Sequence, residues 1–420
     1  MEDTLAIAHC KATNGMLFAI YDGHGGPSCS QVISKRLLTY VCTALAKPYL
    51  EPYNQFLQLD QIDPKHFIQD VTSTVELRAE LTSLYQESYS DYIRYLATEF
   101  NKTSPEDCIT QAFIHLDKDI SQEALLNLLG NQASYPVEEY KSSHKKMATE
   151  KSVALATLSV AMSGAVACVS YVHNNEIMVA SVGDCQAVVG YQGEDGNWLP
   201  LKVSVEHTTE NPGEVERIFQ EHPKSERDTV LRMDRLLGQL MPLRALGDYR
   251  FKWPRNILEK HVVPIIGRNA LPPNYKTPPY LSATPEIRTH KLAPKDKFLI
   301  VASDGLWDQL TPLEVVRLVG EHMSGREALG SLHLPQGDVS LAEINNMLTA
   351  RREGLRKRPL DRNGATHLLR HALSTTETGL DHDRLSELLT MPDDVVRLFR
   401  DDISIIVIYF NTDYLIKAVP

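Results

Sequence analysis

Short apolar runs of strand length recur along this 420-residue chain, and several of them stop or start at an aspartate. Four runs share this arrangement: Met16–Tyr21 before Asp22, Ile177–Val182 before Asp184, Lys297–Ser303 before Asp304, and Ile403–Phe410 after Asp401. Continuous runs of this length and composition are typical of strands buried in a sheet. The pattern therefore predicts buried strands with carboxylates at their ends.

A hairpin is predicted at the start of the chain. Asn14-Gly15 is typical of a tight turn, so Leu5–Ala8 and Met16–Tyr21 are expected to pair as antiparallel strands. That pairing would bring Glu2-Asp3 close to Asp22. The hairpin therefore adds two more carboxylates to one strand end.

The rest of the chain predicts a mixture of antiparallel strands and helices. Residues 165–189 read as a meander of strands, whereas residues 206–248 read as mostly irregular. Segments of helical period predict helices over Ser28–Ala46, Glu106–Leu129, Thr311–Val319, Asn363–Leu373 and Asp381–Thr390. Without a repeat or a clear linker, residues 1–420 are expected to form a single domain with insertions at about 50–105 and 321–362.

Composition narrows the class of protein. The formal net charge of −11 argues against nonspecific nucleic-acid binding, because that binding depends on Lys and Arg neutralising phosphates. The six cysteines form no Cys-x-x-Cys pair, which predicts reduced thiols without a zinc site. No apolar run approaches the roughly 20 residues of a membrane span, and the first residues resemble neither a secretory nor a transit segment.

Acidic residues at several strand ends predict a metal site. One Asp-Gly pair after an apolar run is more typical of a turn, but several such acids would repel one another if their strand ends met. A cation would relieve that repulsion, and all-oxygen ligands favour Mg²⁺ or Mn²⁺ over zinc. Two such ions could activate a water for attack on phosphorus, with His24 as the candidate general acid. Neither a Cys-x5-Arg sequence nor a nucleotide-binding loop is present.

A set of short motifs resembles, in order, those of the metal-dependent serine/threonine phosphatases of type 2C. The motifs are Glu2-Asp3, Asp22-Gly23-His24-Gly25-Gly26, Ser163-Gly164-Ala165, Gly183-Asp184, Glu206-His207, Arg244-Ala245-Leu246-Gly247-Asp248, Asp304-Gly305-Leu306-Trp307-Asp308 and Arg400-Asp401-Asp402. The resemblance covers essentially the whole chain. It implies an α+β fold in which two antiparallel β-sheets form a central sandwich flanked by α-helices, with a dinuclear metal site at one end.

The same resemblance implies a role for each site residue. Asp22 would bridge two metals, Gly23 would give its carbonyl to one of them, and Asp304 and Asp401 would bind the other. Glu2 and Asp3 would hold metal-bound waters, Asp184 and Asp308 match a weaker third-metal site, and His24 would be the general acid.

Further stretches resemble the pyruvate dehydrogenase phosphatase branch of this family. These stretches are Asp234–Gly238, Leu240–Asp248, Phe251–Trp253, Pro272–Leu281 and Ala365–His371. The resemblance implies dephosphorylation of phosphoserine on the pyruvate dehydrogenase component, and so reactivation of that complex. It also implies the mitochondrial matrix, docking on the lipoyl domain of the dihydrolipoamide acetyltransferase core with Ca²⁺ in some relatives, and a regulatory subunit.

The chain departs from the family pattern at its beginning. The family has a phosphate-gripping arginine a few residues before the Glu-Asp pair, and the printed sequence begins too late to contain it, so we expect an N-terminal strand and a transit peptide to be missing. Val166 and Cys185-Gln186 also replace residues that are common in the family. Two alternatives therefore stay open: a type 2C phosphatase with another phosphoprotein substrate, and a pseudophosphatase that docks a partner without turnover.

Overall fold

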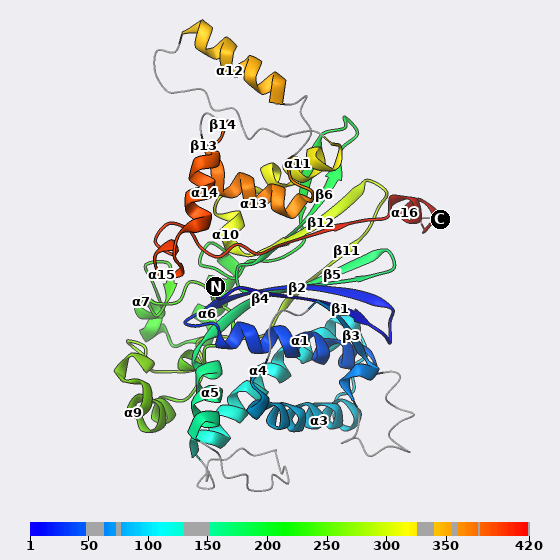
Figure 1. Cartoon of the computed structure of the whole chain (residues 1–420). Helices are drawn as coiled ribbons and strands as arrows, with labels where there is room; N and C mark the ends of the chain where they lie inside the picture. The colour runs from blue at the N-terminus through cyan, green and yellow to red at the C-terminus, as the bar shows by residue number, and fades with distance from the viewer. Residues whose placement is uncertain are drawn as a thin grey trace.

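Two antiparallel sheets form the centre of the computed structural model, which describes residues 1–47, 63–72, 77–129, 151–325, 340–354, 360–376 and 379–418 (Figure 1). The first sheet has the order β11-β5-β4-β2-β1-β3, with β10 paired to β4, and the second has the order β15-β12-β6-β7. Parts of both predicted insertions lie outside the described residues.

The strands have the following bounds. The first sheet contains β1 (Thr4–Cys10), β2 (Gly15–His24), β3 (Ile68–Thr72), β4 (Gly164–His173), β5 (Glu176–Val182), β10 (Leu246–Gly247) and β11 (Glu286–Lys291). The second contains β6 (Gln186–Gln192), β7 (Trp198–Lys202), β12 (Asp296–Ala302) and β15 (Ile405–Tyr409). Two small ribbons pair β8 (Leu231–Arg232) with β9 (Arg235–Leu236) and β13 (Thr375–Thr376) with β14 (Gly379–Leu380).

Helices cover the outer faces of both sheets (Figure 1). On the side of the first sheet lie α1 (Ser28–Leu45), α3 (Thr82–Thr98), α4 (Pro105–Leu129) and α5 (Lys151–Met162). On the side of the second lie α11 (Pro312–Met323), α13 (Gly364–Ser374) and α14 (His382–Thr390). The remaining α-helices of the described residues are α6 (Pro212–Glu221), α7 (Arg227–Val230), α8 (Arg255–Ile257), α9 (Val263–Ile266), α10 (Asp304–Trp307), α12 (Leu341–Gly354), α15 (Asp393–Val396) and α16 (Thr412–Ala418). The α+β sandwich expected from the sequence is confirmed.

The predicted N-terminal hairpin is confirmed. Asn14 adopts a positive φ of 57° at the turn, and the strands pair in register from Cys10 opposite Gly15 to Thr4 opposite Tyr21. Because Thr4 and Tyr21 are opposite each other, Asp3 lies beside Asp22. The hairpin therefore holds two acidic residues at one end of the first sheet.

The chain changes sheets after β5, which the predicted continuous meander did not include. Gly183 adopts a φ of 94°, a conformation that favours glycine, and β6 then pairs with β12 and β7 rather than with β5. Since the apolar runs on both sides are buried, either sheet could accept them, and the periodicity could not locate the change. Asp184 lies at this crossing, between the ends of the two sheets.

A second difference lies in residues 206–248, where an irregular segment was predicted. Pro212–Glu221 is the helix α6, and its N-cap residue Asn211 accepts a hydrogen bond from the backbone N–H of Gly213.

In the part of the chain that the structure describes, no helix is both long and apolar enough to cross a membrane.

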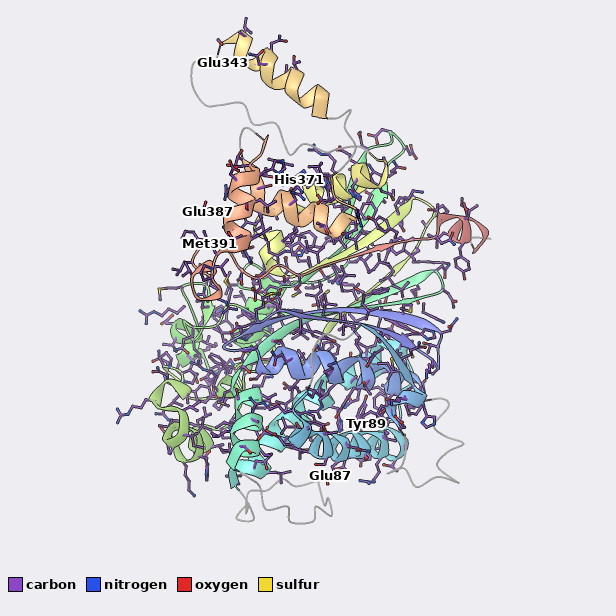
Figure 2. All side chains as sticks on the ribbon, viewed as in Figure 1. Glu87, Tyr89, Glu343, His371, Glu387 and Met391 are labelled. Atoms are coloured by element: carbon purple, nitrogen blue, oxygen red, sulfur yellow. The ribbon has the colours of Figure 1, made fainter. Side chains whose placement is uncertain are left out.

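Buried polar contacts join the helices beneath the first sheet. Arg36 of α1 donates two hydrogen bonds to the Glu123 carboxylate of α4, at 2.7 and 2.9 Å, and both side chains are almost fully buried. Tyr89 of α3, labelled in Figure 2, lies 2.7 Å from the hydroxyl of Thr43 in α1. These contacts fix the three helices relative to one another and so support the sheet that carries β2.

Replacing Glu123 by alanine should lower the free energy of unfolding by about 3–5 kcal/mol, because the charge of Arg36 would remain buried without its partner. Chemical denaturation followed by circular dichroism measures this loss. Glu259→Ala is the matched control, since it removes the exposed partner of Arg255 and should leave the unfolding midpoint nearly unchanged. A loss below about 1 kcal/mol for Glu123→Ala would contradict the structural role of this ion pair.

Candidate active site

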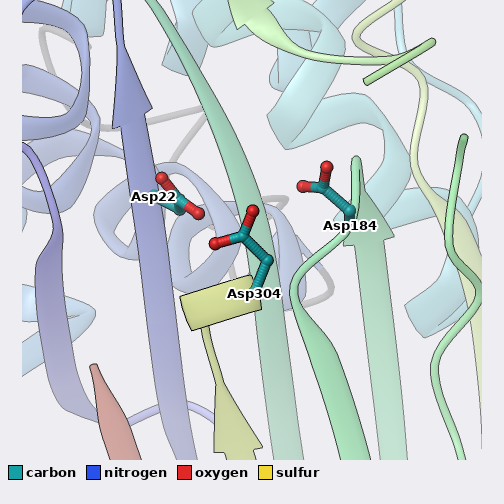
Figure 3. Close-up of side chains that lie close together, drawn as sticks. All are labelled: Asp22, Asp184 and Asp304. Atoms are coloured by element: carbon teal, nitrogen blue, oxygen red, sulfur yellow. The ribbon is translucent and has the colours of Figure 1, made fainter. Parts of the chain in front are cut away.

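Three carboxylates from different elements meet at one end of the sandwich (Figure 3). Asp22 lies in β2 of the first sheet, Asp184 at the crossing between the sheets, and Asp304 at the start of α10, directly after β12. Each offers an oxygen atom, and these atoms all lie within 4.8 Å of one another. The convergence that the strand ends predicted is therefore present, and Asp184 is one of the three central residues.

Burial and mutual repulsion disfavour the charged forms of these carboxylates. Burial raises the pKa of Asp22 well above its usual range, and the charges of Asp3, Asp304 and Asp184 raise it further. Burial, followed by the charge of Asp304, raises the pKa of Asp184 to about 7. Such shifts arise where several acids share a low-dielectric site without a compensating charge. Either protons or cations must supply that charge.

The chemistry of the donors fits a hard divalent cation. Oδ1 of Asp304 and Oδ2 of Asp3 are buried without a hydrogen-bond partner, so two lone-pair donors remain unsatisfied beside the cluster. All of the donors are oxygen atoms, which Mg²⁺ and Mn²⁺ prefer. The residues present therefore match the predicted metal site.

The other carboxylates predicted as ligands, Glu2, Asp3, Asp308 and Asp401, are not part of the group of three whose oxygen atoms lie together. Burial raises the pKa of Asp3 to about 6, opposed by hydrogen bonds with Ser303 and Ser404. Burial raises the pKa of Asp308, and the charge of Asp401 raises it further, so Asp401 is near the site. Oδ1 of Asp401 itself accepts a hydrogen bond from the backbone N–H of Asp402 at 2.7 Å.

Glu2 is held by partners that the sequence did not indicate. Its carboxylate pairs with Arg397 at 2.9 Å, and its backbone N–H donates to Oδ2 of Asp402 at 2.6 Å. Arg397 also lies 3.6 Å from Asp402, so one guanidinium bridges two acids. No motif signalled this contact, because Arg397 precedes the Arg400-Asp401-Asp402 motif and carries no pattern of its own.

His24 ends β2 beside the cluster, following Gly23, which lies opposite Ala165 of β4. Its Nε2 forms a short hydrogen bond with Asp248, a buried residue with a positive φ of 51°. Burial alone would lower the pKa of His24, but the charge and hydrogen bond of Asp248 outweigh it, and the net shift is upward. Gly164 makes room for this pair, since a Cβ there would lie 2.1 Å from Asp248 and 2.2 Å from His24. The sequence placed Asp248 in a motif but assigned it no role.

His207 supports the position of Asp184 through hydrogen bonds with the backbone of Gly183, the preceding residue. Its Nδ1 accepts a hydrogen bond from the backbone N–H of Gly183 at 3.1 Å, and its own backbone N–H donates to the Gly183 carbonyl at 2.9 Å. Burial lowers the pKa of His207 to about 4, so the ring is neutral and can accept this bond. Glu206, the other residue of that motif, instead pairs with Lys202 at the surface.

In a chelating buffer, the carboxyl groups of Asp3 and Asp184 should lower the free energy of unfolding as the pH rises from about 4 to about 7, whereas His207, with its lowered pKa, contributes in the opposite direction. A native carboxyl group with a raised pKa keeps a proton that the unfolded chain releases, so its stabilisation is lost as the pH passes through the native pKa. Mg²⁺ or Mn²⁺ should restore the stability at pH 7.5, because binding to the native state alone stabilises it. Thermal denaturation measures both effects, and an unchanged melting temperature after addition of either ion would contradict the assignment.

Comparison with known proteins agrees with this arrangement. Residues 99–348 match the family described as Protein phosphatase 2C. The chain is 37% identical to human pyruvate dehydrogenase (acetyl-transferring) phosphatase 1, mitochondrial, over 98% of this chain and 75% of that protein. It is 35% identical to the human phosphatase 2 of the same name, over 98% of this chain and 76% of that protein. It is 28% identical to phosphatase 1 of Saccharomyces cerevisiae, over 94% of this chain and 62% of that protein. The chain belongs to the protein phosphatase 2C family.

Proposed function

We propose that this chain is a metal-dependent protein serine/threonine phosphatase that removes phosphate from phosphoserine on the pyruvate dehydrogenase component. The observation that carries the proposal is the cluster of Asp22, Asp184 and Asp304, with unsatisfied carboxylate oxygens beside a histidine that is paired with Asp248. The relatives that bear the name of this activity match nearly the whole chain, which supports the choice of substrate.

The carboxylates would hold two divalent ions, Mg²⁺ or Mn²⁺, with Asp22 between them and the carbonyl of Gly23 as a further ligand. Asp304 and Asp401 would complete the second position, Glu2 and Asp3 would orient waters, and Asp184 and Asp308 would serve a third ion. When bound, such ions activate water and neutralise negative charge on a transferring phosphoryl group.

His24 would supply the proton that the leaving serine oxygen needs. Its Nε2 is engaged by Asp248, so Nδ1 is the nitrogen that would donate to the substrate. The Asp248 carboxylate raises the pKa of His24 and so favours the protonated ring that a general acid needs. Asp248 would hold the ring in one orientation and stabilise its positive charge.

The mitochondrial names of the relatives support a mitochondrial protein, and we place it in the matrix with its substrate. The lipoyl domain of the acetyltransferase core, a Ca²⁺ ion at that contact and a regulatory subunit are proposed as further partners. The competing function is a pseudophosphatase that only docks a partner. The capture of the Glu2 carboxylate by Arg397 favours that alternative, whereas the cluster of unsatisfied acids favours catalysis.

Phosphate release from phosphorylated pyruvate dehydrogenase tests the proposal. Release should require Mg²⁺ or Mn²⁺, and Asp304→Asn should reduce it by more than about 100-fold, since even outer partners of metal ligands contribute about 10- to 100-fold. Asp413→Asn, on the exposed part of α16, is the matched control and should behave as the unchanged chain. Release that persists in excess chelator would contradict the metal assignment, and no release by a folded, metal-binding chain would support the docking module.

His24→Ala should slow the hydrolysis of a phosphoserine peptide by about 100-fold or more, the contribution expected of a positioned general acid. The loss should be much smaller with p-nitrophenyl phosphate, because p-nitrophenolate leaves without a proton. The comparison requires kcat for both substrates at the same pH and metal concentration. Equal losses on the two substrates would remove His24 from the role of general acid.

A further inference from the structure

Residues 395–400, here called the rim segment, expose large apolar side chains next to the carboxylate cluster. The segment includes the end of α15 and leads directly into Asp401. Leu398 is 82% exposed, Phe399 is 61% exposed and Val395 is 38% exposed. Because these side chains pack so little against the core, the fold does not explain why they are apolar.

Specific contacts tie the rim segment to the site. Arg397 pairs with Glu2 and lies 3.6 Å from Asp402, as described above. The residues after Asp402 pair with β12, where the hydroxyl of Ser303 accepts a hydrogen bond from the backbone N–H of Ser404 at 3.0 Å. Ser303 immediately precedes Asp304 of the cluster. Figure 1 likewise places α15 and the N-terminus at the same end of the sandwich.

The rim segment also carries a positive charge beside the acidic residues of the site. The side chain of Arg397 is 47% exposed, and its guanidinium borders the carboxylates of Glu2 and Asp402. Its charge offsets part of the negative charge of these two carboxylates at this side of the site. The apolar side chains at positions 398 and 399 directly follow this cation in the sequence.

We infer that the rim segment binds the polypeptide that flanks the phosphoserine, with Leu398 and Phe399 contacting an apolar side chain of the substrate. This inference rests on the proposed function. Leu398 and Phe399 lie three and two positions before Asp401, so the backbone from Leu398 to Asp401 spans at most about 11 Å. An extended substrate covers the same span in about three residues, so the recognised side chain lies within about three positions of the phosphoserine.

The rim segment is expected to bind a substrate peptide rather than a second copy of the chain, because it leads directly into Asp401 of the site. A phosphoserine can reach the carboxylates only if its neighbouring residues pass over the surrounding surface, and the rim segment is part of that surface. Apolar side chains with few contacts in the free protein can bury area against such a substrate without rearrangement of the core.

Two phosphoserine peptides test the inference, one with leucine and one with serine at a position within three residues of the phosphoserine. The unchanged chain should hydrolyse the leucine peptide with about tenfold higher kcat/KM, mainly through a lower KM. The double variant Leu398→Ser/Phe399→Ser should lose this preference, while p-nitrophenyl phosphate, which has no flanking residues, should be hydrolysed within about twofold of the original rate. Scanning the leucine along the peptide locates the recognised position.

The matched control is the double variant Leu341→Ser/Ile416→Ser, whose residues are 84% and 58% exposed. They lie on α12 and α16, away from the end that holds α15 (Figure 1), and should leave the preference unchanged. Equal rates for every leucine position in the unchanged chain would overturn the inference, as would an equal loss on p-nitrophenyl phosphate in the rim variant. No hydrolysis of any substrate by the unchanged chain with metal present would contradict the proposed function, and the inference with it. Hydrolysis of the peptides without a preference for leucine would contradict the inference alone.

Discussion

The burial of several carboxylates at one end of a sandwich is the constraint that the site depends on. Asp22, Asp184 and Asp304 belong to strands or strand ends whose apolar residues are fixed in the core of the two sheets. Moving any one carboxylate into water would shift a strand out of register and expose its buried face. The repulsion therefore cannot be relieved by rearrangement, and the folded chain must bind protons or cations there. A divalent cation compensates more charge than one proton, which is why the fold and metal binding are coupled.

Several surrounding residues hold His24, Asp184 and Glu2 in position beside the cluster. Asp248 orients His24 from the side of β10, and His207 fixes the turn that carries Asp184. Arg397 bridges Glu2 and Asp402, so residues far apart in the sequence are joined beside the site. The same region exposes Leu398 and Phe399. Charge compensation, proton donation and the proposed contact with substrate thus lie within a short distance along one edge of the sandwich.

The sequence indicated the parts of the site that depend on strand ends, because a buried strand followed by an aspartate is a local pattern. The hairpin of β1 and β2 was predicted from Asn14-Gly15, and with it the position of Asp3 beside Asp22. The change of sheets at Gly183 was missed, because buried strands of either sheet have the same apolar composition. α6 is a different case, because Asn211-Pro212 at its start and the apolar Val215, Ile218 and Phe219 at helical spacing are local signals that the prediction of an irregular segment overlooked.

Contacts between residues far apart in sequence were outside the reach of pattern analysis. Asp248 and His24 are brought together by the pairing of β10 and β2 with β4, and nothing near either residue indicates the other. Arg397 was missed for the same reason. The roles assigned to Gly23, Asp308 and Asp401 stay predictions, whereas the grouping of Asp22, Asp184 and Asp304 is a property of the fold.

A crystal structure of the chain grown with Mn²⁺, with diffraction recorded at an energy where manganese scatters anomalously, tests whether the three carboxylates bind a divalent cation. Anomalous peaks are expected between the carboxylates of Asp22, Asp184 and Asp304, with oxygen ligands at distances typical of Mn²⁺. An ordered structure with no anomalous peak there, and with the same carboxylates joined to one another by shared protons, would contradict cation binding.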